Sequence, residues 1–208
     1  MLIILTIVIV LAILLINEYW WRIRTVHSEL SRKFVHITVG CFVASWPFFL
    51  SWQQIQLLSI GFLLVVGLSK YLRLFQAIHS VQRPTWGELF FAASVGAITL
   101  ITDDKWIYAT ALLQMALADG LAAIIGVRYG NRRRYQVTGQ PKSVVGTLTF
   151  FVVSLGILAV YSHWSGTVLA LGFMVLLSAS ASAIENLAVK GLDNLLVPLL
   201  IAIILVNH

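Results

Sequence analysis

A single carboxylate interrupts an otherwise apolar helical stretch, QMALADGLAAIIGVRYG, at residues 114–130. A charge at the centre of a membrane helix costs roughly 2.5–3.5 kcal/mol on insertion scales, so such residues normally face a polar cavity or a partner. Helical steps of seven and eleven residues lead from Asp119 to Gly126 and Gly130 on nearly the same face. Small residues on that face are typical of close helix packing, and they also leave room for a nucleotide or lipid headgroup at the backbone. Packing alone does not require the aspartate.

A candidate phosphate site follows in GNRRRYQVTGQPKSVVGTL, residues 130–148. This basic loop, which contains glycine and proline, ends in Lys142 and Ser143 where the next apolar stretch begins. Lysine acts as a point charge on phosphate, and the first N–H groups and the dipole of a helix attract the same anion. The glycine spacing before Lys142 differs from that of a P-loop. The pattern therefore predicts a different anion site, and the alternative is a solvated charged loop.

A third polar group lies in SRKFVHITVG, residues 31–40, at the entry to an apolar stretch. Arg32, His36 and Gly40 recur every four residues and share one helical face. A histidine on an apolar helix is more often a hydrogen-bonded core residue than a catalyst. The neighbouring charges of Arg32 and Lys33 favour a role toward the substrate.

Two more stretches carry isolated polar groups. RPTWGE places Arg83 and Glu88 around a turn, which is also what a capped helix start looks like. SASASAIENLAVKGLDN carries Glu185 in an apolar helix, then Asp193 and Asn194 after a glycine turn. Glu185 raises the same question as Asp119, whereas Asp193 is also placed to cap the last helix.

The elements that must position these groups are membrane helices. Of the 208 residues, 60% are hydrophobic and 11% are charged, against about 25% charged residues in an average soluble domain. The mean hydropathy is +0.93. A helix needs roughly 17–25 mostly apolar residues to cross a bilayer. The chain is therefore expected to be an all-α polytopic membrane bundle of about seven or eight transmembrane helices, the fourth being the weakest, at residues 2–19, 34–51, 54–70, 88–102, 107–127, 144–161, 166–186 and 193–206.

The distribution of basic residues predicts the orientation of this bundle. If the N-terminus is extracytoplasmic, thirteen of the fourteen Lys and Arg residues fall on the cytoplasmic side and only Lys105 falls outside. We therefore expect an inner-membrane protein with both termini extracytoplasmic and its active site at the cytoplasmic side. Topology and anionic lipid contact alone also explain this bias. Nucleic-acid binding is not expected, because the basic residues lie in short loops. Residues 71–82 are expected to lie along the inner interface as an amphipathic helix.

We expect one domain over residues 1–208, since the chain shows neither an internal repeat nor a low-complexity linker. Within this domain, we expect residues 1–30 to contain a retained N-terminal span and residues 31–200 to form the core. The only cysteine, Cys41, excludes a disulfide or a cysteine-based metal site within one chain.

The polar motifs taken together resemble the membrane polyprenol kinase family, which includes dolichol kinase, phytol kinase and the CTP-dependent diacylglycerol kinase of fungi. The resemblance covers roughly residues 30–200 and rests on RKFVH, RPTWGE, ADGLAAIIGVRYG with KSVVGT, and IENLAVKGLDNLLVPL. One departure is Val145 before Gly146, where relatives often carry an acidic residue.

The resemblance implies a lipid-alcohol kinase that transfers a phosphoryl group from CTP, with Mg²⁺, to a membrane prenol such as phytol or dolichol, or to diacylglycerol. Such a reaction depends on alignment and charge neutralisation. The implied catalytic residues are Asp119, His36 and Glu185, and the implied metal ligands are Asp119, Glu185 and Asp193. The implied nucleotide and phosphate contacts are Lys142, Ser143, Gly126, Gly130, Arg83, Arg32, Lys33 and Asn194.

Two alternatives remain. A phosphatidate cytidylyltransferase-like enzyme has a related pattern and would release pyrophosphate, and a small transporter would hold its carboxylates near the membrane midplane. If Asp119 is catalytic, Asp119→Asn should fold with unchanged or higher thermal stability and lose at least about 100-fold of its activity.

Overall fold

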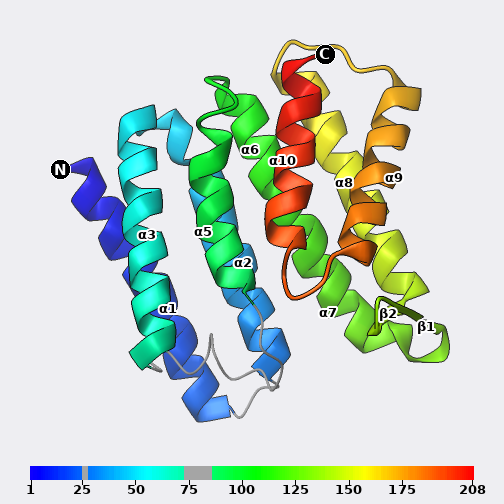
Figure 1. The fold of residues 1–208 in the computed structure, drawn as a ribbon, viewed down its shortest axis with the longest axis horizontal. Helices are drawn as coiled ribbons and strands as arrows, with labels where there is room; N and C mark the ends of the chain where they lie inside the picture. Colours follow the sequence, from blue (N-terminus) through cyan, green and yellow to red (C-terminus); the bar gives the residue numbers. More distant parts are fainter. Residues whose placement is uncertain (25–27, 73–85) are drawn as a thin grey trace.

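The computed structural model is a bundle of helices that run in alternating directions between two ends (Figure 1). It describes residues 1–24, 28–72 and 86–208, with the backbone alone at 21–24, 28, 29, 31, 69, 70 and 72. A short β-hairpin lies at one end of the bundle, called the hairpin end below, and the C-terminus lies at the other. Residues 73–82 of the expected interfacial helix, and Arg83, lie outside the described residues.

The helices follow the apolar stretches of the sequence in order. They are α1 (Leu2–Arg24), α2 (Ser28–Ala44), α3 (Trp52–Leu72), α5 (Gly87–Ile98), α6 (Lys105–Leu113), α7 (Asp119–Tyr129), α8 (Val144–Trp164), α9 (Leu171–Leu187) and α10 (Asp193–Val206). A π-helix η2 (Gln114–Ala118) joins α6 to α7, and short 3₁₀ turns form η1 (Trp46–Phe48) and η3 (Gly130–Arg132). The strands are β1 (Arg134–Val137) and β2 (Gln140–Ser143).

The length and composition of these helices are those of a multi-pass membrane protein. Three helical stretches in the described part of the chain are long and apolar enough to cross a bilayer: Leu2–Trp20, Lys105–Arg132 and Val144–Trp164. Shorter apolar helices are Trp52–Leu68, Gly87–Ile98, Leu171–Leu187 and Asp193–Val206. The prediction of an all-α membrane bundle is confirmed, with the hairpin as a small exception. The fourth predicted span is indeed short, since α5 has 12 residues.

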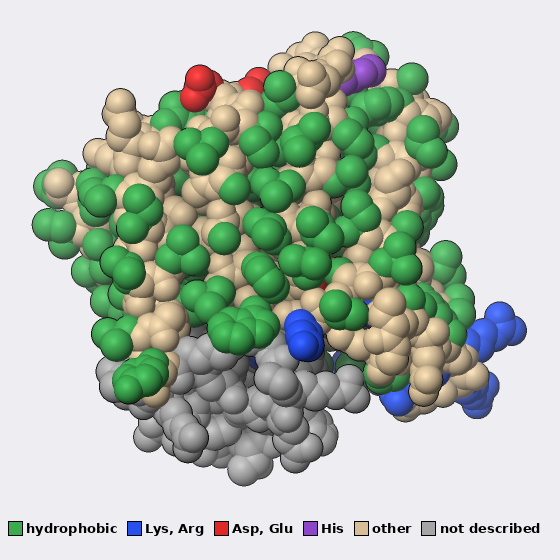
Figure 2. Space-filling view, in the orientation of Figure 1, with side chains coloured by type: hydrophobic (Ala, Val, Ile, Leu, Met, Phe, Trp, Pro, Cys, Tyr) green, Lys and Arg blue, Asp and Glu red, His purple; other side chains and the backbone are tan. Residues whose placement is uncertain are grey.

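The central element of the bundle is the long helix formed by α6, η2 and α7. Its fully buried side chains include Tyr108, Leu112 and Met115, and α2, α8 and α10 pack around it. On the face of the molecule that Figure 2 shows, apolar side chains cover the middle, acidic ones lie at the upper edge and basic ones at the lower edge. An apolar belt between two polar rims is what a lipid-facing surface requires.

The connection between α7 and α8 differs from the predicted loop. β1 and β2 pair in antiparallel register, with Val137 opposite Gln140, so the turn between them has two residues. These are Thr138 and Gly139, with φ of 49° and 75°. Positive φ at both central residues is the type I′ geometry that matches the twist of a hairpin, and glycine adopts it without steric cost.

Several helices begin or end on the hairpin side of Asp119. At the hairpin end, α2, α5 and α10 begin and α9 ends, while α7 continues ten residues beyond Asp119 (Figure 1). That extension is about 15 Å at 1.5 Å per residue. Loops and helix ends therefore surround a carboxylate that belongs to a continuous helix.

Candidate active site

Asp119 is buried and paired with a lysine from another helix. Lys33, early in α2, places its Nζ 2.5 Å from Asp119 Oδ2, and both side chains are less than one-tenth exposed. Arg32 lies within electrostatic range of the same carboxylate. A buried charge is tolerated when it is paired and hydrogen-bonded. Lys33 therefore explains how an apolar helix keeps its aspartate.

His36 lies one turn further along α2 and also faces this carboxylate. Its Nε2 is 3.5 Å from Asp119 Oδ2 and 3.0 Å from the backbone oxygen of Met115, in the π-helix. A carbonyl oxygen only accepts, so Nε2 donates to Met115 and is not available as a base. The ring also packs edge-on against Phe91. These contacts favour a positioning role for His36, and its predicted catalytic role remains a prediction.

A second lysine–carboxylate pair joins the hairpin to the end of α9. Lys142 Nζ donates to Glu185 Oε1 at 2.5 Å and to the Glu185 backbone oxygen at 3.0 Å. Burial disfavours the charge on Lys142, but the adjacent carboxylate of Glu185 outweighs this effect and raises the pKa of Lys142 above its ordinary value. The ammonium therefore stays charged at neutral pH.

The two ion pairs belong to one charged cluster. Asp193, the first residue of α10, lies within electrostatic range of Asp119, Lys33, Lys142 and Glu185. Its side chain makes no capping hydrogen bond in the described part of the chain, because the N-cap position belongs to Leu192. The capping alternative for Asp193 is therefore not supported. We call Arg32, Lys33, Asp119, Lys142, Glu185 and Asp193 the charged cluster.

The starts of α5 and α10 are tied together beside this cluster. Asn194 Nδ2 donates to the Gly87 backbone oxygen at 2.9 Å, and Trp86 N donates to the Lys190 backbone oxygen at 3.0 Å. A Cβ on Gly191, whose φ is +87°, would meet Gly87 Cα at 2.5 Å. Asn194 thus has a clear structural role, and its contact with a nucleotide remains a prediction.

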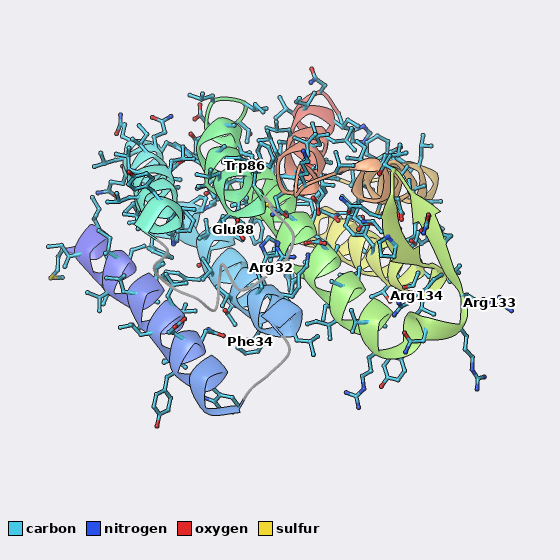
Figure 3. All side chains as sticks on the ribbon, turned by 60° about the horizontal axis from the view of Figure 1, so that its bottom comes forward. Arg32, Phe34, Trp86, Glu88, Arg133 and Arg134 are labelled. Atoms are coloured by element: carbon cyan, nitrogen blue, oxygen red, sulfur yellow. The ribbon has the colours of Figure 1, made fainter. Side chains whose placement is uncertain are left out.

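The labelled side chains of Figure 3 show where the basic residues lie. Arg32 is grouped with Trp86 and Glu88 at the starts of α2 and α5, whereas Arg133 and Arg134 lie on the hairpin side. Arg133 and Arg134 are exposed, and Glu88 stands half-exposed in the first turn of α5. Arg32 is therefore the arginine in this view that belongs to the charged cluster.

The glycines of α7 hold the hairpin close to the helix. A Cβ on Gly130 would meet Ser143 Oγ at 2.4 Å, and one on Gly126 would meet it at 2.9 Å. Ser143 also caps α8, since its Oγ accepts from Gly146 N at 3.0 Å. Ser143 fills the space above both glycines, which favours the close-packing alternative over a nucleotide in contact with their backbone.

Three residues that were not predicted from the sequence fix the hairpin to α8 and α9. Tyr135 of β1 donates to Asn186 Oδ1 at 2.6 Å, and Thr147 Oγ1 of α8 lies 3.1 Å from the same oxygen. Asn186 directly follows Glu185, and the pairing of strands sets Tyr135 opposite Lys142. The Thr-Gly turn was the available signal, because it implies a hairpin and hence this cross-strand pair.

The residues of the charged cluster have the donor chemistry of a magnesium site without a preassembled one. In the described part of the chain, no group of three or more His, Cys, Asp or Glu side chains is placed to hold a metal ion. Mg²⁺ is, however, usually held by one or two carboxylates together with substrate phosphates and water. Asp119, Glu185 and Asp193 supply oxygen ligands of that kind, so they fit the ion.

The chain is similar to curated proteins over most of its length. The phytol kinase of Synechocystis sp. is 34% identical over 198 residues, which cover 90% of this chain and 83% of that protein. The probable chloroplastic phytol kinase of Triticum aestivum is 31% identical over 200 residues, covering 85% of this chain and 66% of that protein. A probable chloroplastic phytol kinase of Glycine max is 28% identical over 194 residues, covering 85% and 64%. No family model matches the chain, and no solved structure does either.

A helical membrane bundle with a cluster of lysines and carboxylates at one end, together with these relatives, defines a membrane lipid kinase. The chain belongs to the phytol kinase family. A kinase of this kind uses a nucleotide as phosphoryl donor, as the resemblance of the sequence motifs to the polyprenol kinases implies.

Proposed function

We propose that this protein transfers the γ-phosphoryl group of CTP to the hydroxyl of a prenol in the membrane, with phytol as the first candidate acceptor. The observation that carries the proposal is a pair of lysine–carboxylate contacts at one end of the bundle, the buried Lys33–Asp119 pair and the partly buried Lys142–Glu185 pair. The printed names of the relatives support phytol as acceptor. CTP as donor and Mg²⁺ as cofactor come from the resemblance of the motifs.

The nucleotide is bound by the basic groups around the charged cluster. Lys142 exchanges the Glu185 carboxylate for a phosphate oxygen, so nucleotide binding frees Glu185. Lys33, Arg32 and Ser143 approach the same phosphates from α2 and from the start of α8. Asn194, near the start of α10, and Arg83, which lies outside the described residues, complete this proposed set.

Asp119 is the proposed base for the acceptor. The lipid oxygen attacks the γ-phosphorus, its proton passes to Asp119, and the bond from the γ-phosphorus to the bridging oxygen breaks to release CDP. Lys33 holds the Asp119 carboxylate in its charged form before the reaction. When bound, Mg²⁺ would neutralise charge on the phosphates, with Asp119, Glu185 and Asp193 as its protein ligands.

The hairpin end is the proposed cytoplasmic side of the inner membrane. Thirteen of the fourteen basic residues fall on that side when both termini are extracytoplasmic. The nucleotide then enters from the cytoplasm, and the acceptor keeps its chain in the bilayer with its hydroxyl at the inner interface.

A product assay separates the alternatives. Purified protein in detergent is incubated with CTP or ATP, Mg²⁺ and a panel of phytol, dolichol and diacylglycerol, and the products are identified by mass. We expect phytyl monophosphate and CDP. Pyrophosphate with a CDP-lipid, formed from added phosphatidate, would establish the cytidylyltransferase instead. The transporter alternative predicts no phosphorylated lipid.

A further inference from the structure

The hairpin that carries Lys142 has a second attachment to α9. Tyr135 donates its phenol proton to Asn186 Oδ1 at 2.6 Å and accepts from the hydroxyl of Thr147, whose Oγ1 lies 3.1 Å from the same amide oxygen. Asn186 Nδ2 donates to the Ser182 backbone oxygen at 2.8 Å. That bond turns the amide oxygen toward the two hydroxyls, so the acceptor of the attachment is held in place by α9 itself.

The two attachments are matched residue by residue. Tyr135 and Lys142 are directly opposite in the hairpin, so their side chains lie on the same face of the two strands. Their partners, Asn186 and Glu185, are consecutive residues at the end of α9. Two residues that face each other across the hairpin therefore contact two consecutive residues of α9.

The two attachments differ in what happens during the reaction. The Lys142–Glu185 pair must open when Lys142 binds phosphate, whereas the Tyr135–Asn186 bond joins two groups that have no part in the chemistry. A bond that stays closed keeps the hairpin against α9 while the lysine changes its partner.

We propose that Tyr135 and Asn186 are positioning residues that hold the Lys142 ammonium within reach of the nucleotide phosphates. This role rests on the proposed function, in which Lys142 binds the nucleotide. The role predicts that substitutions of Tyr135 or Asn186 weaken binding of the nucleotide alone, because binding of the acceptor lipid does not depend on the hairpin.

The test is a set of kinetic constants for hydroxyl-deletion variants. Tyr135→Phe keeps the ring and removes the hydrogen bond to Asn186, and it leaves the Thr147 hydroxyl free to donate to Asn186 instead. The net loss is one hydrogen bond, so the KM for the nucleotide should rise about 3- to 10-fold, the range for one such bond. The kcat and the KM for the lipid should not change. Tyr129→Phe, at an exposed tyrosine that ends α7, is the matched control and should behave as the unmodified protein. Asn186→Ala should raise the nucleotide KM as Tyr135→Phe does. The double variant of Tyr135→Phe and Asn186→Ala should show no larger rise.

A double variant tests whether Tyr135 acts through Lys142. In the Lys142→Ala background, Tyr135→Phe should cause no further rise in the nucleotide KM. Additive effects, an equal rise in the lipid KM, or no effect of both Tyr135→Phe and Asn186→Ala would overturn the positioning role. If Lys142→Ala itself leaves the nucleotide KM unchanged, the assignment of Lys142 in the proposed function is wrong, and the positioning role falls with it.

Discussion

Lys33 Nζ and Asp119 Oδ2 lie 2.5 Å apart although the two residues are separated by 86 positions in the chain. The pair changes what is expected of substitutions at either residue. A lone aspartate in an apolar helix would be a burden on stability, and its removal would be neutral or favourable. A paired one leaves an uncompensated ammonium behind, and breaking a buried pair costs about 3–5 kcal/mol. The expectation of unchanged or higher stability for Asp119→Asn therefore loses its physical basis.

Asp119→Asn should lower both activity and stability. The amide cannot take a proton from the acceptor, and loss of a general base costs about 10²–10⁴-fold in rate. The melting temperature in detergent should also fall, because Lys33 loses its partner. Lipid phosphorylation and thermal unfolding measure the two effects on the same preparation.

The double variant Lys33→Met with Asp119→Asn separates the two roles of the aspartate. Removing both charges leaves no unpaired ion, so stability should return toward that of the unmodified protein. Activity should stay lost. A double variant that recovers most of its turnover would show that Asp119 serves the fold and is not the base.

Lys142→Ala should raise the KM for the nucleotide more than the KM for the lipid, because its proposed partner is phosphate. Lys142→Arg should restore only part of the function, since a planar guanidinium does not reproduce a compact ammonium. Steady-state kinetics with each substrate varied in turn provide the comparison. A change confined to the lipid KM would contradict the assignment.

The charge on Lys142 should make nucleotide binding insensitive to pH in the neutral range. Burial works against this charge, but Glu185 raises the pKa of Lys142 above its ordinary value of 10.5. A raised pKa means that the contribution of the ammonium is complete below the ordinary value and disappears only as the pH rises through the folded value. Below pH 10.5, the pH profile of the nucleotide KM should therefore have the same shape in the unmodified protein and in Lys142→Arg. A limb that is present in the unmodified protein and absent from Lys142→Arg is not expected. Such a limb would mean that the lysine titrates near neutrality.

The parts of this structure that depend on local sequence could be predicted, and the parts that depend on tertiary partners could not. Apolar run length located the helices, including the short α5. Glu185 and Lys142 could be grouped from their places near helix ends, whereas Asp119 lies midway along the continuous helix from Lys105 to Arg132. The pairing of each carboxylate with a particular lysine depends on how α2 and the hairpin are rotated against α7 and α9, which one sequence does not specify. The strands of the hairpin have four residues each, too few for a clear period-two pattern.

The orientation in the membrane should be visible by cysteine labelling. Arg133 is exposed beside the hairpin, and the exposed residue Asn207 lies next to the C-terminus at the opposite end of the bundle. In a Cys41→Ser background, Arg133→Cys should react with a membrane-impermeant reagent only after the cells are opened. Asn207→Cys should react from outside intact cells. Labelling of position 133 from outside would reverse the orientation and with it the proposed cytoplasmic site.

Gly130→Ala should disturb nucleotide binding through the hairpin, because a Cβ there would come within 2.4 Å of Ser143 Oγ and 2.5 Å of Ser143 Cβ. Ser143 precedes α8 and follows Lys142, so displacing it moves the lysine as well as the helix cap. We expect a higher nucleotide KM and a lower melting temperature. Gly156→Ala is the matched control within a helix, since a Cβ at Gly156 meets nothing within 4 Å. That change should be neutral or stabilising by roughly 0.5–1 kcal/mol, the helix preference of alanine over glycine. If Gly130→Ala matches Gly156→Ala in both KM and stability, the close contact of α7 with Ser143 does not hold the phosphate-binding lysine in place.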